Sequence, residues 1–185
     1  MDLLDLHRRT LDVATDLVGQ LNDTHVALPT PCTEWDVRAL VHHMIVGNWM
    51  AVALLAHEVP DLTTDPLASR NAVDAYRESA EAATAAFGEP GALASQVLHP
   101  IAGTVGAEQY LGFRLADQAA HVWDLARACD LLANLPQDVC DAAVEITRQR
   151  FGDGPRPVGM MDAAQPAPVG ASAADRMAAF LGRVV

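Results

Sequence analysis

Residues 107–132 read AEQYLGFRLADQAAHVWDLARACDLL, and this stretch decides the fold. Large apolar side chains recur in it at helical spacings, at Leu111, Leu115, Val122 and Leu125. On the same predicted helix Asp117 and His121 stand four residues apart, so their side chains share one face. The stretch therefore predicts a helix with a buried side and a side that could carry chemistry.

The Asp117–His121 spacing is typical of helices that bind a metal ion through two adjacent turns. A third ligand must come from another element, and His42 and His43 are the histidines well inside another predicted helix. Helix phase favours His43, which lies beside an apolar stripe, whereas His42 points about 100° away. Gly47, one turn after His43, predicts room for a substrate. The simpler interpretation of the pair is a weak ion pair on a solvated helix.

Apolar periodicity and helix-start signals predict further helices at residues 2–22, 35–57, 70–87, 136–151 and 172–181. Thr33 is expected to cap the helix at 35–57, with Asp36 in the capping-box position. An irregular connection is expected at 91–106, with a short strand-like piece around Val97, and a linker at 151–160.

The predicted elements define an all-α fold, a four-helix bundle with additional short C-terminal helices. Residues 1–132 are expected to form the bundle. Residues 133–185 are expected to form a C-terminal helical extension packed on it.

Composition narrows the function classes. The 185 residues include 24 acidic and 12 basic ones, so the net charge is −12. This charge disfavours binding to nucleic acid and to anionic membranes. No apolar run reaches the ~18 residues of a membrane span, and the first residues do not read as a signal peptide. A cytoplasmic protein is therefore expected. All the basic residues are Arg, which suggests a GC-rich genome of the actinobacterial kind.

Other polar residues leave alternatives open. His7 lies on an apolar face and is expected to be a core histidine bonded to a polar partner, or to line the pocket. Asp124 would orient His121 or pair with Arg127. Arg114 would bind an anionic substrate or form a surface ion pair. Cys32 stands just before the helix at 35–57, where a thiol can have a redox or nucleophilic role, but a buried structural thiol is expected because the sequence shows no base near it.

Two long motifs and the tail resemble a known family. Residues 30–50 read TPCTEWDVRALVHHMIVGNWM, residues 114–128 read RLADQAAHVWDLARA, and the chain nears its end with DRMAAFLGR at 175–183. These segments resemble the mycothiol-dependent maleylpyruvate isomerase family of DinB-like metal-binding four-helix bundles, in particular a short subgroup. The resemblance covers nearly the whole chain.

The resemblance implies a divalent metal ion held by His43, Asp117 and His121, with zinc expected first and nickel as the alternative. It also implies mycothiol as a cofactor, so that a low-molecular-weight thiol would be activated to attack an electrophilic substrate by S-transfer or isomerisation. The isomerase itself has Glu at the position of Asp117, and it has a larger C-terminal domain.

Two other functions stay open from the sequence. One is a non-catalytic metal-binding sensor or interaction module, and the other is a metal-free bundle with structural histidines. The alanine-rich segment at 70–87 could face a second copy, which would make a homodimer.

Overall fold

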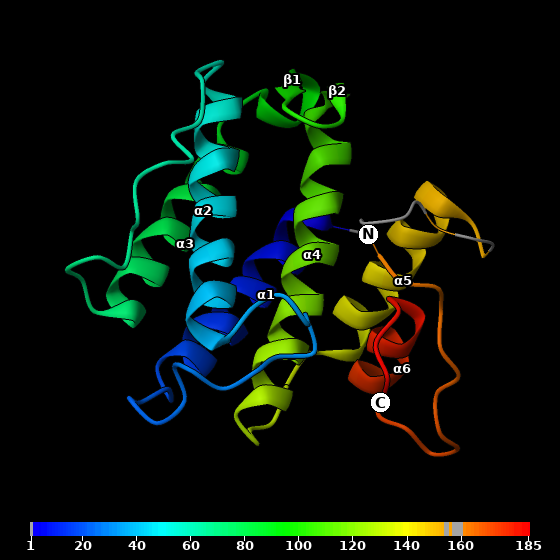
Figure 1. The fold of residues 1–185 in the computed structure, drawn as a ribbon. Helices are drawn as coiled ribbons and strands as arrows, with labels where there is room; N and C mark the ends of the chain where they lie inside the picture. Colours follow the sequence, from blue (N-terminus) through cyan, green and yellow to red (C-terminus); the bar gives the residue numbers. More distant parts are fainter. Residues whose placement is uncertain (1, 154–155, 157–160) are drawn as a thin grey trace.

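The computed structural model describes residues 2–153, 156 and 161–185. Its helices are α1 (Leu3–Val18), α2 (Val37–Leu55), α3 (Ala72–Gly88), α4 (Ala107–Ala128), α5 (Gln137–Phe151) and α6 (Ala173–Phe180). A short 3-10 helix, η1 (Ala92–Ala94), precedes the strands β1 (Gln96–His99) and β2 (Gly103–Gly106). The predicted all-α class is confirmed (Figure 1).

The first four helices form the bundle. Helix α1 packs against α3 and α4, and α2 packs against the same two helices from the other side. The buried apolar stripes of all four helices meet in one core, which includes Leu11, Leu40, Met44, Tyr76 and Leu115. This burial is the main driving force for the fold.

Helix α4 lies between the other bundle helices on one side and α5 and α6 on the other. Most of its 22 residues are buried, because α5 and α6 cover the side that the bundle leaves free. Figure 1 shows α5 and α6 beside α4, away from α2 and α3. A helix enclosed in this way can position polar side chains precisely from its interior turns.

Helix boundaries differ from the predictions where local turns intervene. Asp36, not Thr33, caps α2, and its side chain accepts a hydrogen bond from the backbone N–H of Ala39 at 2.8 Å. The predicted cap was wrong because residues 32–35 form a turn closed by the Trp35 N–H and the Cys32 carbonyl. Helix α4 ends at Ala128, four residues earlier than predicted.

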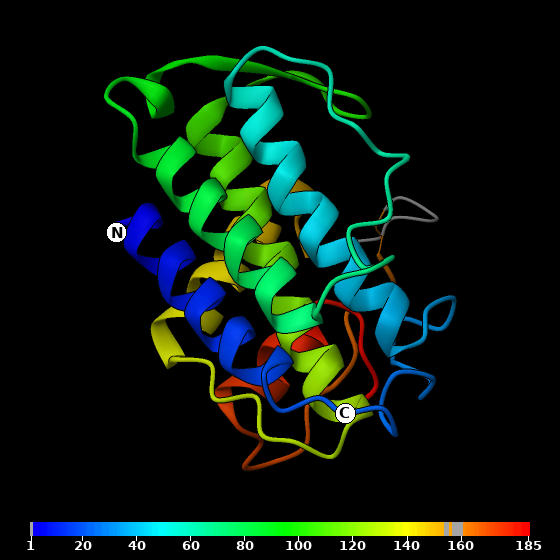
Figure 2. The ribbon, with the colours of Figure 1, turned by 90° about the vertical axis from the view of Figure 1, so that its left-hand side faces the viewer.

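The connection before α4 contains a small hairpin. Strands β1 and β2 pair antiparallel, with Val97 opposite Val105, so the strand-like piece predicted at Val97 is confirmed. The side chain of Val97 is buried on the side of the hairpin that faces the bundle. Figure 2 shows the hairpin lying across one end of the bundle.

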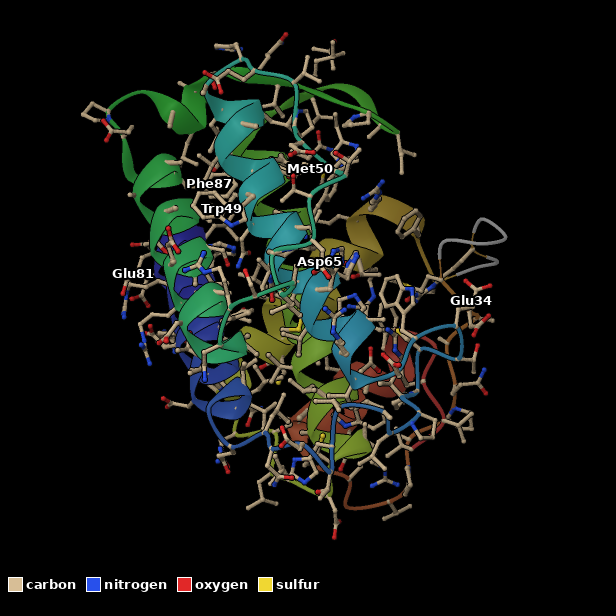
Figure 3. The ribbon with its side chains drawn as sticks, turned by 60° about the vertical axis from the view of Figure 1, so that its left-hand side comes forward. Glu34, Trp49, Met50, Asp65, Glu81 and Phe87 are labelled. Carbon is tan, nitrogen blue, oxygen red and sulfur yellow. The ribbon has the colours of Figure 1, made fainter. Side chains whose placement is uncertain are left out.

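The outer face of α3 is charged. Its alanines Ala75, Ala80 and Ala83 are buried in the bundle, whereas Glu81 points away from it (Figure 3). The alanine-rich face that motivated the homodimer is therefore used inside the chain, and the homodimer stays a prediction.

Most of the linker predicted at 151–160 lies outside the described residues. Within the described part of the chain, α2 is long and apolar enough to cross a membrane by length and composition, and half of that segment is buried inside the fold.

Candidate metal centre

Helices α2 and α4 bring together the three residues of the predicted metal group. Donor atoms of His43, Asp117 and His121 all lie within 4.8 Å of one another. His43 Nε2 is 3.7 Å from one carboxylate oxygen of Asp117, and His121 Nε2 is 3.4 Å from the other. His42 is not in this group, because its Nε2 lies 3.9 Å from Asp65 instead.

The geometry of these residues fits a divalent ion. Tetrahedral donors about 2.1 Å from an ion would be separated by about 3.4 Å, close to the separations observed. His43 Nε2 is buried and has no hydrogen-bond partner among the described residues, although the His43 side chain is 35% exposed. An unsatisfied nitrogen that faces a carboxylate and a second imidazole is what a metal ligand lacking its ion would show.

The loop before α2 forms one wall of this group. Trp35 stacks on His43 with ring centroids 4.4 Å apart and lies 5.7 Å from the His121 ring. The hydroxyl of Thr30 donates to the Trp35 carbonyl at 2.8 Å and so fixes the loop. Trp35 packs against the hydrophobic core, and its indole also covers the candidate site.

Arg114 fills the space over Gly47, so the room predicted there for a substrate is not present. A Cβ on Gly47 would lie 2.5 Å from an Arg114 guanidinium nitrogen. Arg114 is 4% exposed and donates to Asp117 at 2.8 Å, so it forms a buried ion pair and not a surface one. Absence of a side chain at residue 47 lets the guanidinium reach α2.

A buried polar network continues from Arg114 into the bundle. Arg114 and the Gln118 amide both donate to Asn48 Oδ1, at 3.3 and 2.8 Å. The Tyr76 hydroxyl donates to Gln118 Oε1 at 3.0 Å, and Asn48 donates to Ser79 at 3.1 Å. This network was not predicted from the sequence, although polar residues at apolar helix positions, such as Asn48 in α2 and Gln118 in α4, were a signal for it.

The other ring nitrogen of His121 faces a second group. Its Nδ1 lies 3.1 Å from Asp124 and 3.9 Å from Cys32 Sγ. Asp124 thus lies where it can orient His121, but its cationic partner is Arg183 and not Arg127, which lies over the Trp123 ring. The expectation that Cys32 has no base near it was wrong, because its sequence neighbours say nothing about α4.

Cys32, His121 and Asp124 also have donor atoms close enough to hold an ion. Arg183, however, donates to both Asp124 oxygens, at 2.7 and 3.0 Å, and lies 3.3 Å from Cys32 Sγ. Arg183 thus occupies both oxygens of Asp124, whereas Arg114 donates only to Oδ2 of Asp117 and leaves Oδ1, which faces His121, free for an ion. The group around His43 is therefore the better metal site of the two.

The charges at the site depend on one another. Burial alone would raise the pKa of Asp117, but His121 and Arg114 hold it well below its ordinary value. Burial alone would lower the pKa of His121, but Asp117 and Asp124 raise it well above its ordinary value. A metal ion would therefore displace a proton from His121 as it binds.

His7 lies apart from the three ligands. It is 1% exposed and packs edge-on against Phe87, and neither ring nitrogen has a hydrogen-bond partner within the described part of the chain. The prediction of a core histidine is right about burial and wrong about the polar partner. Burial lowers the pKa of His7 to about 3, with a smaller contribution from the charge of Arg114.

The fold and this site define a class of helical bundle that carries a candidate metal centre between its second and fourth helices. The model of one family, described as the mycothiol maleylpyruvate isomerase N-terminal domain, matches residues 7–126. The chain therefore belongs to this family, as its motifs predicted.

Individual relatives agree with this assignment. Two Mycobacterium tuberculosis proteins, Uncharacterized protein MT0763 of strain CDC 1551 / Oshkosh and Uncharacterized protein Rv0738 of strain H37Rv, are each 30% identical over 191 residues, covering 100% of both chains. A crystal structure of a histidine-to-alanine mutant of mycothiol-dependent maleylpyruvate isomerase superposes with a TM-score of 0.59 at 17% identity, covering 77% of this chain and 67% of that one. The DinB-like bundle fold is thereby confirmed.

Proposed function

We propose that the protein binds a divalent metal ion, zinc in preference to nickel, through His43, Asp117 and His121. We further propose that it uses the ion to activate mycothiol, a low-molecular-weight thiol, for S-transfer to an electrophile or for isomerisation. One observation carries the metal proposal, namely the buried and unpartnered Nε2 of His43 beside two other donors. Membership of a family described by mycothiol supports the choice of thiol.

The balance of charge around the ligands supports thiol activation. Asp117 shares its charge with Arg114 at 2.8 Å, and Asp124 is paired with Arg183. The protein therefore brings little uncompensated negative charge to the site. A divalent ion held there would supply the positive charge that lowers the pKa of an incoming thiol.

The site is also accessible. The side chains of His43 and Asp117 are each 35% exposed, whereas His121 is nearly buried. A thiol would enter on the His43–Asp117 side, where Trp35 offers an apolar wall beside the His43 ring. His121, held from behind by Asp124, would keep a fixed orientation while a ligand exchanges.

The electrophile and the type of reaction are inferred from the family and not from residues of the site. The family model ends at residue 126, so α5 and α6 lie outside the match. We place the reaction in the cytoplasm, where mycothiol would be kept reduced, and assign it to small molecules and not to nucleic acids or membranes.

A second function keeps the same ligands without catalysis. Because Arg114 already neutralises Asp117, the site could bind an ion reversibly and act as a metal-binding sensor or interaction module. Thiol binding separates the two functions, since only the enzyme needs a thiol to approach the ion.

The experiment begins with metal analysis of the purified protein after supplementation with zinc or nickel. We expect about one ion per chain in the wild type and none in His43→Ala, with His42→Ala as the matched control that keeps its metal. Titration of the zinc-loaded protein with mycothiol should then show saturable binding. A wild type without metal would refute the metal site, and a loaded protein without thiol affinity would favour the module.

A further inference from the structure

Arg183 lies beyond α6, near the end of the chain, yet it reaches the candidate metal centre. Its guanidinium donates to both carboxylate oxygens of Asp124, with Nη2 at 2.7 Å and Nε at 3.0 Å. Such a two-point pair fixes the orientation of a carboxylate more strongly than a single hydrogen bond does. Asp124 is fully buried and Arg183 is 15% exposed, so solvent screens this pair weakly.

The backbone after α6 is built to deliver this arginine. Gly182 has φ +94, and its N–H donates to the Ala179 carbonyl, while the Arg183 N–H donates to the Ala178 carbonyl. These two bonds form a Schellman motif, which turns the chain sharply at the end of a helix. A Cβ on Gly182 would also lie 2.7 Å from the Asp162 carbonyl oxygen. Both the positive φ and the lack of space therefore require glycine at this position.

The carboxylate that Arg183 fixes contacts a candidate ligand. Asp124 Oδ2 lies 3.1 Å from His121 Nδ1, on the side of the ring opposite the Nε2 that faces Asp117. When Nδ1–H donates to a carboxylate, the Nε2 lone pair is left free for a metal and the ring cannot rotate.

We propose that Arg183, acting through Asp124, is a positioning residue that holds His121 with Nε2 toward His43 and Asp117. The short segment after α6 is thereby a working part of the metal centre. This inference rests on the metal site of the proposed function. The guanidinium has a second effect. It closes the Cys32 side of His121 to a cation, so that only the side facing His43 and Asp117 is left for an ion.

The two ends of α6 supply a matched control. At its start, Asp175 accepts a hydrogen bond from the Trp123 indole at 2.9 Å, so α6 is attached to two consecutive residues of α4. The attachment at Asp175 does not contact His121. A merely structural role for Arg183 would make the two attachments equivalent for metal binding.

The test measures zinc affinity by chelator competition in the full chain, for wild type, Arg183→Met, Asp124→Asn and Asp175→Asn. We expect Asp124→Asn to bind zinc about 10-fold to 100-fold more weakly, the usual cost of losing a partner of a metal-bound histidine. Arg183→Met should bind zinc more weakly by a smaller factor, because Arg183 acts on His121 only through Asp124. Asp175→Asn should lower the melting temperature but keep wild-type affinity. Arg183→Lys should recover part of the affinity lost in Arg183→Met, since it restores the charge without the second hydrogen bond.

The visible spectrum of the cobalt-substituted protein gives a second readout, because it reports ligand geometry and not stability. We expect altered bands in Arg183→Met. A new thiolate-to-cobalt band in Arg183→Met would also support the proposal if the band disappears when Cys32→Ser is added. Such a band would mean that the ion has moved to the Cys32 side of His121, which Arg183 closes in the wild type. Wild-type affinity together with a wild-type spectrum in Arg183→Met and Asp124→Asn would overturn this inference alone. A wild type that binds neither zinc nor cobalt would instead overturn the proposed function and, with it, this inference.

Discussion

Two histidines, His7 on α1 and His121 on α4, are both buried, at 1% and 6% exposure, in opposite electrostatic surroundings. His121 lies between the carboxylates of Asp117 and Asp124, and its pKa is raised well above the ordinary value. His7 lies against Phe87 without a polar partner, and burial lowers its pKa to about 3. The same residue type at similar depth therefore favours the charged form in one region and the neutral form in the other.

The difference shows that burial alone does not make a histidine functional. Desolvation disfavours the charged form of both rings, and only the neighbouring carboxylates reverse this effect at His121. Arg114 affects both regions, since its charge lowers the pKa of Asp117 and also contributes to the low pKa of His7. Substitutions at His7 and around His121 alter one side of this comparison at a time.

The largest expected effect is on metal binding. His121→Ala should weaken zinc binding by more than about 100-fold, because losing a direct ligand exceeds the cost of losing a ligand's partner. His7→Leu should leave zinc affinity unchanged, since His7 does not belong to the ligand group. Chelator competition on both folded variants measures the contrast, and equal losses in the two would remove the distinction between the histidines.

The next effect is on stability in acid. His7 stays neutral in the folded protein down to about pH 3, whereas in the unfolded chain it takes up a proton below about pH 6.5. Burial of His7 therefore costs no stability above pH 6.5. As the pH falls from 6.5 toward 3, the unfolded chain gains a proton that the folded protein does not take up, so the free energy of unfolding falls. At pH 5 the loss amounts to about 2 kcal/mol of unfolding free energy.

His7→Leu should remove that loss, so its unfolding free energy should fall less steeply than that of wild type between pH 7 and pH 5. Urea unfolding at both pH values measures the slope. The buried Leu11 on the same helix gives the control, because Leu11→Ala removes no titratable group and should lower stability while keeping the wild-type slope. Parallel curves for His7→Leu and wild type would mean that His7 takes up its proton at the same pH in the folded and the unfolded chain.

Most of the fold could be predicted from the sequence, and part of the site could. Apolar periodicity marks a helix whatever surrounds it, so the six helices and the piece at Val97 were predictable. The i, i+4 spacing of Asp117 and His121 and the phase of His43 depend only on helix geometry, and the structure brings these three residues together.

The remaining features depend on contacts between distant segments. Arg183 reaches Asp124 across 59 residues, and no local pattern connects them. Gly47 indicated open space, but the occupant of that space, Arg114, comes from α4. The contrast between His7 and His121 was equally hidden, because it depends on the side chains that pack against each ring and not on a local pattern.

A smaller effect is expected from two helical glycines. Gly47→Ala places a methyl group within 2.6 Å of two Arg114 nitrogens, whereas Gly112→Ala meets Ile146 at an ordinary 3.5 Å. Overpacking costs roughly 1–3 kcal/mol and better helix propensity returns about 0.5–1, so Gly47→Ala should lose about 1 kcal/mol of unfolding free energy. Gly112→Ala should gain up to about 1 kcal/mol. Urea unfolding of both variants decides, and a gain in Gly47→Ala would show that Arg114 can leave Asp117 freely.

The smallest effect concerns the length of the acid at residue 117. Asp117→Glu extends the carboxylate by one methylene, which lets it reach past Arg114 toward His43 Nε2, now 3.7 Å away. We expect zinc affinity to rise by less than about tenfold, because the ligand types and the net charge stay the same. Chelator competition measures the change, with Glu108→Asp at the exposed start of α4 as a control for acid length. A loss of affinity in Asp117→Glu would mean that the shorter acid is matched to the spacing of the two histidines, and that the Arg114 ion pair sets the position of the carboxylate.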